Sequence, residues 1–345
     1  MFRRFSSLVG AAAFILSLAS SGANAQQPLQ LKMATVGPPN AYFYTEVLIP
    51  WMEAVNRDSQ GTLNIRHFGG GVLANAGNMY DSVLNGAADL GWVLLGSGQG
   101  KLVKSSVVEL PFGYEKGEAG ATALWRLYEK GVIASDFDNL KVFGFTAWPT
   151  AAIQTKSKKI QTLEDMKGVK LRVSGRWQAA TVSAFAATPV SLPVDETYQA
   201  IDKSVIDGAW TSLVATRQFR LEEITKYFLD APLNGGGGMI VMKRETYDKR
   251  PPAAKAAFEK RSGETLSRAL GKSNDGEVVR VKTMLNNLAS QGKLNAPYSL
   301  SATEFERWKK AAGTVTAAWV PTVPDGAAVL DAYRAEVSTL EPALK

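Results

Sequence analysis

The sequence of 345 residues contains no cysteine and a single histidine, His67. The lack of cysteine excludes disulfides, thiol nucleophiles and thiolate metal sites, so stability must come from burial of a hydrophobic core. One histidine cannot form a histidine zinc cluster, and serine–histidine catalysis would have to use His67 itself. We interpret His67 as a residue at the end of a strand beside a turn.

Two glycine clusters lack the patterns that bind nucleotides. Neither Gly69 to Gly71 nor Gly235 to Gly238 is followed by Lys-Ser or Lys-Thr, and no G-x-G-x-x-G opens a helix after a first strand. Glycine clusters of this kind allow backbone conformations that other residues avoid. We expect a turn at the first cluster and a hinge between domains at the second.

The sequence also lacks a recognisable catalytic arrangement. Glu222 and Glu223 are adjacent carboxylates without a partner base, and neighbouring residues on a helix point apart. Asp89 and Asp207 lie in turns, where such side chains usually accept hydrogen bonds from backbone amides. We therefore predict that the protein is not an enzyme, and we expect no cofactor and no metal site.

The first 25 residues, MFRRFSSLVGAAAFILSLASSGANA, have the three parts of a secretory signal peptide. Arg3 and Arg4 form the basic head, the apolar stretch is too short to span a bilayer, and Ala23-Asn24-Ala25 is a cleavage site. The prediction is cleavage after Ala25 and a soluble periplasmic protein. The remaining 320 residues suffice for two domains.

The formal net charge of +7 includes the two leader arginines, and the rest of the excess is spread along the chain. No basic run is dense enough to predict binding to nucleic acid. Strand-like and helix-like stretches alternate, from the Leu29, Leu31, Met33 alternation onward, with short glycine turns between them. This order predicts an α/β fold with a parallel-rich sheet. Pro50 predicts that the first helix is kinked or begins late.

Four blocks occur in order along the chain: LKMATVGPPNAYFYTEVLIPWMEAVN, GGGVLANAGNMYDSVLNGAADLGWV, TLEDMKGVKLRVSG and DETYQAIDKSVIDGAW. With these blocks the sequence resembles the solute-binding proteins of TRAP transporters, of the dicarboxylate-binding type. The L-x-D-M-K-G-x-K-L-R-V and V-I-D-G blocks are the most specific parts. The resemblance covers essentially the whole chain after the leader.

The resemblance implies a periplasmic binding protein fold, in which two α/β lobes are joined by crossing strands and a long helix and close over a ligand. Lobe I would comprise residues 26–149 and about 238–277. Lobe II would comprise residues 150–237 and about 278–335, with the second lobe beginning near Thr150. The ligand cleft would lie between the lobes.

In the family, the arginine of the L-R-V block binds the ligand's carboxylate, and here that residue is Arg172. A guanidinium matches a carboxylate with two parallel hydrogen bonds, and a closed cleft shields the pair from water. A second cleft arginine of some members corresponds to Ala152, and an asparagine that often follows the later Asp-Gly corresponds to Thr211. These departures argue against a sialic-acid type of ligand and put simple C4-dicarboxylates in doubt.

Other candidates cluster at the ends of expected strands, where open α/β sheets bind ligands. Arg176 follows Arg172 at the start of a helix, and helix N-termini favour anions. Aromatic walls beside one arginine indicate a monocarboxylate with an apolar or aromatic body. The predicted ligand-binding residues are Arg172, Arg176, Trp210, Thr211, Trp92, Trp148, Asn40, Tyr42, Phe43 and Trp177.

The resemblance therefore predicts the solute-binding component of a TRAP transporter, acting as a monomer, that captures an organic acid and delivers it to the membrane subunits. Alternatives stay open at this point: a C4-dicarboxylate ligand, a binding protein that serves a sensor, and a ligand held through a bound cation, although no acidic cluster supports the last.

Overall fold

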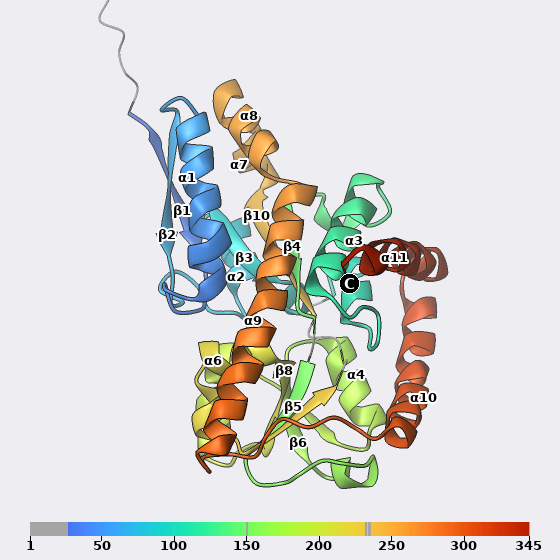
Figure 1. The fold of residues 1–345 in the computed structure, drawn as a ribbon. Coiled ribbons are helices and arrows are strands. Elements are labelled where there is room, and N and C mark those ends of the chain that lie inside the picture. The colour runs from blue at the N-terminus through green and yellow to red at the C-terminus, as the bar shows by residue number, and fades with distance from the viewer. Residues whose placement is uncertain (1–26, 99, 150, 232, 234–235, 345) are drawn as a thin grey trace, which may run out of the picture.

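The computed structural model describes residues 27–344 except 99, 150, 232 and 234–235. The predicted leader, Thr150 and Gly235 lie outside the described residues. Two lobes lie one above the other, each built around a five-stranded sheet covered by helices (Figure 1). Among the described residues, no helix combines the length and the apolar character needed to cross a membrane.

The first sheet has the strand order β2-β1-β3-β10-β4. Strands β1 and β2, and β1 and β3, pair in parallel, whereas β10 runs antiparallel to β3 and β4. In β1, Leu31 and Met33 of the predicted alternation are buried, while Leu29 at the start of the strand is exposed. The strands are β1 (Leu29–Ala34), β2 (Leu63–Phe68), β3 (Leu90–Leu94), β4 (Leu140–Ala147) and β10 (Gly237–Lys243).

The second sheet has the order β7-β6-β8-β5-β9. Here β6 runs parallel to β7 and β8, and β5 runs antiparallel to β8 and β9. A separate hydrophobic core lies between this sheet and the helices α4 (Arg176–Ala184) and α10 (Ala302–Trp319). The strands are β5 (Ala151–Thr155), β6 (Lys170–Val173), β7 (Thr188–Ser191), β8 (Gly208–Ser212) and β9 (Tyr227–Ala231).

Eleven α-helices lie among the described residues. The first is preceded by a π-helical turn at Tyr44–Leu48, so α1 begins at Ile49 with Pro50 in its first turn, where no backbone N–H is needed. The helices are α1 (Ile49–Asp58), α2 (Met79–Leu84), α3 (Gly117–Glu129), α4 (Arg176–Ala184), α5 (Thr197–Asp202), α6 (Leu213–Gln218), α7 (Arg244–Asp248), α8 (Pro252–Arg261), α9 (Glu264–Ser290), α10 (Ala302–Trp319) and α11 (Gly326–Leu340).

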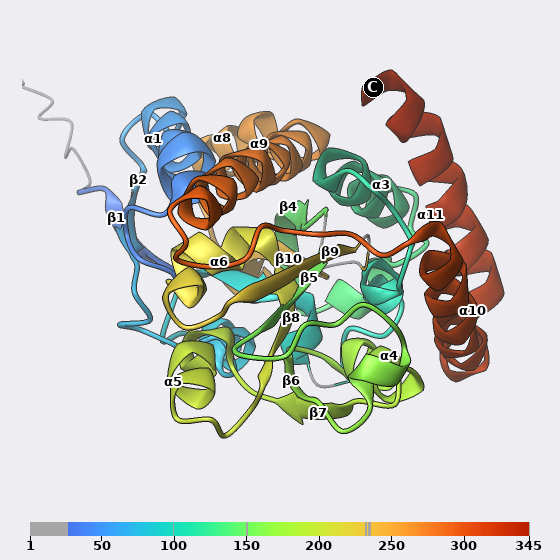
Figure 2. The same ribbon diagram turned by 60° about the horizontal axis from the view of Figure 1, so that its bottom comes forward.

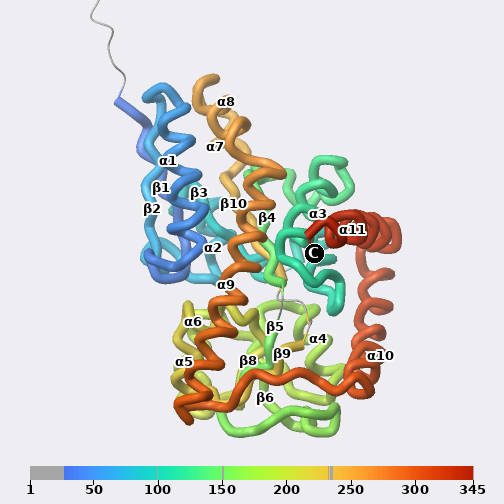
Figure 3. The backbone as a smooth tube through the Cα atoms, in the orientation of Figure 1, coloured from blue at the N-terminus to red at the C-terminus, as the bar shows by residue number. Residues whose placement is uncertain are grey.

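Helix α9 is 27 residues long and runs past both lobes (Figure 3). It packs on α3 and β4 of the first lobe and reaches α6 of the second. The segment after it crosses the second lobe beside β9, where Asp230 N donates to Tyr298 O, and leads to α10 (Figure 2). The two-lobed fold with hinge strands and a long helix confirms the predicted fold class.

The chain returns to the first lobe after α10. Helix α10 packs on α4 of the second lobe, whereas α11 packs on α3 of the first. The predicted assignment of residues 278–335 to the second lobe is therefore wrong for α11. Its apolar residues Val329, Tyr333 and Val337 belong to the core of the first lobe, and none of them lies in the core of the second sheet.

The described residues of the two segments that connect the lobes are hydrogen-bonded to each other. Trp148 N donates to Gly236 O at 3.2 Å, and Ala151 N donates to Leu233 O at 2.6 Å. The Tyr114 hydroxyl lies 2.9 Å from the Trp148 carbonyl oxygen and 3.0 Å from that of Gly236. One buried side chain of the first lobe thus holds both crossovers at the same point.

The crossing of α3 and α9 depends on a glycine. A methyl group at position 271 would lie 2.3 Å from the Gly117 carbonyl oxygen. Since backbone cannot move aside as a side chain can, we expect Gly271→Ala to lower the free energy of unfolding by about 1–3 kcal/mol. Gly276→Ala on the same helix is the matched control, because its methyl group would lie 3.8 Å from the nearest atom, the Arg280 Nη1. Removing that helical glycine should raise stability by up to about 1 kcal/mol. Urea unfolding measures both, and equal effects would contradict the packing argument.

Candidate functional site

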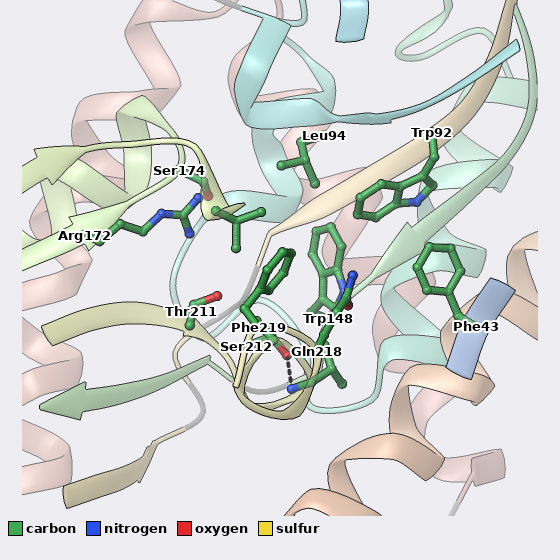
Figure 4. A pocket seen from close by; sticks show the side chains of 13 residues that line it. Phe43, Trp92, Leu94, Trp148, Arg172, Ser174, Thr211, Ser212, Gln218 and Phe219 are labelled. Carbon is green, nitrogen blue, oxygen red and sulfur yellow. Dashed lines mark hydrogen bonds between the residues drawn. The ribbon is translucent and has the colours of Figure 1, made fainter. Parts of the chain in front are cut away.

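A cavity lies between the lobes, beside the crossovers (Figure 4). It holds about 490 Å³ of space free of protein atoms, solvent at its mouth included. The first lobe and the crossover contribute its apolar wall, and the second lobe contributes its polar side. The lining residues are Phe43, Trp92, Leu94, Trp148, Arg172, Ser174, Val194, Thr211, Ser212, Val214, Ala215, Gln218 and Phe219.

Strand alternation aims Arg172 into this cavity. On β6, Leu171 and Val173 face the second core, so Arg172 between them faces the other side of the sheet, toward the cleft. Its neighbour on β8 is Ala209, and Thr211 lies two residues further along the same face. Ala152 of β5 lies opposite Thr211. Ala152, the position that corresponds by resemblance to a second arginine, therefore lies on the same face of the sheet as Thr211, where it is fully buried and offers only a methyl group.

The guanidinium of Arg172 is a buried cation without a counter-ion. The residue is 2% exposed, and its Nε donates to Leu192 O at 2.9 Å. Among the described residues, no carboxylate lies within ion-pair distance of it, and its two Nη groups have no hydrogen-bond partner. Burial lowers the pKa of Arg172 to about 10, an effect that the more distant charge of Asp195 opposes. An anion placed beside the Nη groups would relieve this desolvation.

Three aromatic side chains form the opposite end of the cavity. The Phe43 and Trp92 ring centroids lie 5.2 Å apart, and the Trp148 ring meets Trp92 edge-on at 5.7 Å. In Figure 4, Arg172 lies to the left and these three rings lie toward the right, with Phe219 drawn between them. Such a wall accepts an aromatic or apolar body by burial and ring packing. The Trp92 Nε1 is buried there and has no hydrogen-bond partner within the described chain.

The structure brings together five of the predicted binding residues: Phe43, Trp92, Trp148, Arg172 and Thr211. A second, larger space of about 1770 Å³ adjoins the cavity and shares Arg172 with it. Arg176 and Trp177 line that space instead, with the Arg176 guanidinium 4.9 Å from the Trp177 ring centroid. These two residues therefore flank the cleft without lining the aromatic cavity.

Three predicted residues lie elsewhere. Trp210 points to the opposite face of β8, is 1% exposed and stacks on Phe185 in the second core. Tyr42 is buried and donates through its hydroxyl to Asn274 on α9, and Asn40 is exposed in the preceding turn. Strand ends locate a cleft, but adjacent residues on a strand face opposite sides, so Thr211 and Trp210 cannot both line it.

Sequence reasoning missed the segment after β8. Ser212, Val214, Ala215, Gln218 and Phe219 line the cavity from α6 and its ends. The signal was available, since these residues follow a strand end directly, as Thr211 does. The two aspartates predicted to accept hydrogen bonds from backbone amides do so. Asp89 accepts from Lys32 N and Asp207 from Lys170 N, both at 2.8 Å. His67 lies in β2, bonded to the Thr35 hydroxyl.

Two sheets, crossing strands and a cavity beside the hinge are the features of an extracytoplasmic solute-binding protein. Residues 33–320 match the family described as bacterial extracellular solute-binding protein, family 7. The chain belongs to this family, and it is a TRAP transporter solute-binding protein. The resemblance predicted from the sequence blocks is thus confirmed.

Some similar proteins of known structure bind aromatic acids. A marine metagenome TRAP solute-binding protein specific for aromatic acid ligands, in complex with metahydroxyphenylacetate, has a TM-score of 0.83 at 25% identity, covering 90% of this chain and 99% of its own. A TRAP solute-binding protein from Rhodoferax ferrireducens with copurified benzoate has a TM-score of 0.84 at 23% identity, covering 92% and 100%. A solute-binding protein of Albidiferax ferrireducens is 24% identical over 57% of this chain, which spans 59% of that relative's length.

The assignment of Trp210 to the core is testable by stability. Trp210→Ala removes a fully buried ring and should lower the free energy of unfolding by about 3–5 kcal/mol. Trp148→Ala, which truncates a half-buried ring at the cavity, should cost clearly less because that ring already borders open space. Urea unfolding of both variants decides the matter. A Trp210 variant as stable as the wild type would contradict its placement.

Proposed function

We propose that this protein captures a monocarboxylate with an aromatic or apolar body and that Arg172 binds the carboxylate. One observation carries the proposal: a buried guanidinium without a counter-ion lies at one end of a cavity whose other end is aromatic. The carboxylate would take the place of water and of a protein counter-ion at the Nη groups, with the Thr211 hydroxyl beside it. The aromatic acids bound by similar proteins support this ligand class.

The arrangement favours one anionic group over two. Ala152 leaves the sheet face beside Thr211 without a second cation, and the remaining wall is aromatic. A second carboxylate there would lose its hydration without gaining a partner. A C4-dicarboxylate would instead have to reach Arg176 through the adjoining space. The dicarboxylate therefore remains the second candidate, supported by the position of Arg176.

Binding would close the lobes, because the ligand would touch both. Arg172 and Thr211 belong to the second lobe, and Phe43 and Trp92 to the first. A ligand shifts a conformational equilibrium only by its difference in affinity for the two states, and contacts on both sides of the cleft exist only when it is closed. The closed, loaded form would then deliver the acid to the membrane subunits of a TRAP transporter.

Substitution of Arg172 should separate binding from stability. In Arg172→Met, the affinity for benzoate should fall by about 2–5 kcal/mol, roughly 30-fold to several thousand-fold, because a buried carboxylate would lose its cation. The ligand-free variant should be as stable as the wild type or more stable, by up to about 3 kcal/mol, since an unpaired buried charge is removed. Calorimetric titration and urea unfolding measure the two effects.

Arg176→Met is the matched control, and it should bind benzoate with nearly wild-type affinity. A thermal-shift panel of benzoate, phenylacetate, branched monocarboxylates and C4-dicarboxylates tests the ligand class, because a ligand of the folded state raises the melting temperature. Undiminished benzoate binding by Arg172→Met would refute the anchor. Stabilisation by dicarboxylates alone would refute the monocarboxylate and favour Arg176.

A contact at the rim of the cavity gives an independent test of closure. Gln218 of the second lobe reaches across to Gly37 of the first, so that a methyl group at position 37 would lie 1.9 Å from Gln218 Nε2. Gly37→Ala should therefore weaken benzoate binding by about 0.5–1.5 kcal/mol, because the end of the Gln218 side chain would have to leave its rotamer to make room in the closed form. The double variant Gly37→Ala/Gln218→Ala should recover most of the loss. Additive losses in this double-mutant cycle would show that the two residues do not meet in the bound state.

A further inference from the structure

A carboxyl group lies at the seam where the two lobes touch. Glu109 ends the short helical turn Ser105–Glu109 of the first lobe, and its side chain lines the larger space beside the cavity. A methyl group at position 96 would lie 2.6 Å from Glu109 Oε1, and one at position 175 would lie 3.0 Å from both carboxyl oxygens. Gly175 belongs to the second lobe, so the carboxyl is enclosed by backbone from both lobes.

The contact between the lobes also explains why a glycine occupies position 175. Its backbone is extended, at φ −148° and ψ 168°, which any residue can adopt. The glycine is therefore not needed for the turn after β6. It is needed because the carboxyl of Glu109 occupies the place of a side chain. Gly96 is restricted from the same side and also lies against the Ser174 carbonyl oxygen, 3.1 Å from an added methyl group.

The carboxyl has no partner within the described chain. Glu109 is 5% exposed, and no described residue forms an ion pair or a hydrogen bond with its carboxyl. The charged groups that face the same space are Arg172 on β6 and Arg176 on α4, neither within ion-pair distance. Tyr114 is the other titratable group nearby, and the turn Leu95–Gly98 contributes none. Burial raises the pKa of Glu109 to about 7 from an ordinary value of 4.5.

We propose that Glu109 is a proton-binding site at the seam between the lobes, so that closure over the ligand takes up a proton. The proposal rests on the function proposed above, because closure is driven there by an acid bound at Arg172. Separation of the lobes would withdraw Ser174 and Gly175 and return the carboxyl to water, where it is ionised at neutral pH. In the closed form, desolvation and the negative charge of a ligand carboxylate near Arg172 both favour the neutral acid.

The sign of the pH dependence follows from linkage. The closed form binds a proton at Glu109 below about pH 7, and the open form does so only below about 4.5. Ligand affinity should therefore rise as the pH falls from 8, by up to about tenfold per pH unit below 7. Measurements between pH 8 and 5.5 avoid the titration of the ligand's own carboxyl group.

The test is calorimetric titration of the full protein with benzoate in two buffers of different ionisation enthalpy. The difference in observed heat gives the number of protons taken up. We expect about half a proton per benzoate at pH 7 and nearly one at pH 6. Glu109→Gln should take up none and should bind with an affinity that does not change over this range. Glu222→Gln, which removes another carboxyl with a raised pKa away from the seam, should behave as the wild type.

The proposal would be overturned if the wild-type protein bound benzoate without taking up a proton. It would also be overturned if Glu109→Gln still took up a proton when it bound benzoate. If benzoate does not bind at all, the proposed function fails, and a ligand found in the thermal-shift panel then decides the role of Glu109. A carboxyl whose pKa is raised in the closed form stabilises that form at low pH and loses this contribution as the pH rises through about 7. With saturating ligand, Glu109→Gln should therefore melt several degrees above the wild type at pH 8 and close to it at pH 5.5, whereas without ligand the difference should not vary with pH. A difference with saturating ligand that does not vary with pH would overturn the proposal.

Discussion

The cleft is organised around a cation that the fold buries without a counter-ion. The guanidinium of Arg172 is held by one backbone carbonyl, that of Leu192, and by the alternation of β6, which fixes the face on which it emerges. A buried charge of this kind is costly unless an anion joins it. The same sheet face presents Thr211 and Ala152 rather than further charges, so the cost can be relieved by one carboxylate.

The first lobe contributes aromatic rings to the cavity and the second lobe contributes the guanidinium, and side-chain contacts at the crossovers hold the connecting segments in place. Tyr114 ties both crossovers, and Asn274 of α9 donates to the Thr146 hydroxyl and the Ala147 carbonyl at 2.8 Å each. Glu277, one turn further along α9, pairs with Arg217 of the second lobe. These contacts hold the described parts of both crossovers and of α9 together at one place beside the cavity.

The sequence supports the prediction of the family, the fold class and the face of Arg172, because these follow from contiguous blocks and from strand position. The aromatic wall of Trp92, Trp148 and Phe43 was predictable for the same reason. Trp210 was misplaced because strand ends do not reveal which of two adjacent residues faces the cleft. Glu109 carried no signal at all, since its environment is created by Gly96 and Gly175, which approach one another only when separate lobes meet.

Arg172 and Glu109 have opposite charges and border the same space, yet they do not pair. Direct pairing would satisfy both groups and hold the empty protein closed, whereas separation leaves each with a desolvation cost in the closed form. In the proposed mechanism, a carboxylate ligand would relieve the cost at Arg172, and a proton would relieve it at Glu109. Closure without ligand would leave Arg172 unpaired, whereas closure with ligand and proton together would remove both costs. This asymmetry would let a membrane partner distinguish loaded from empty protein by its shape alone.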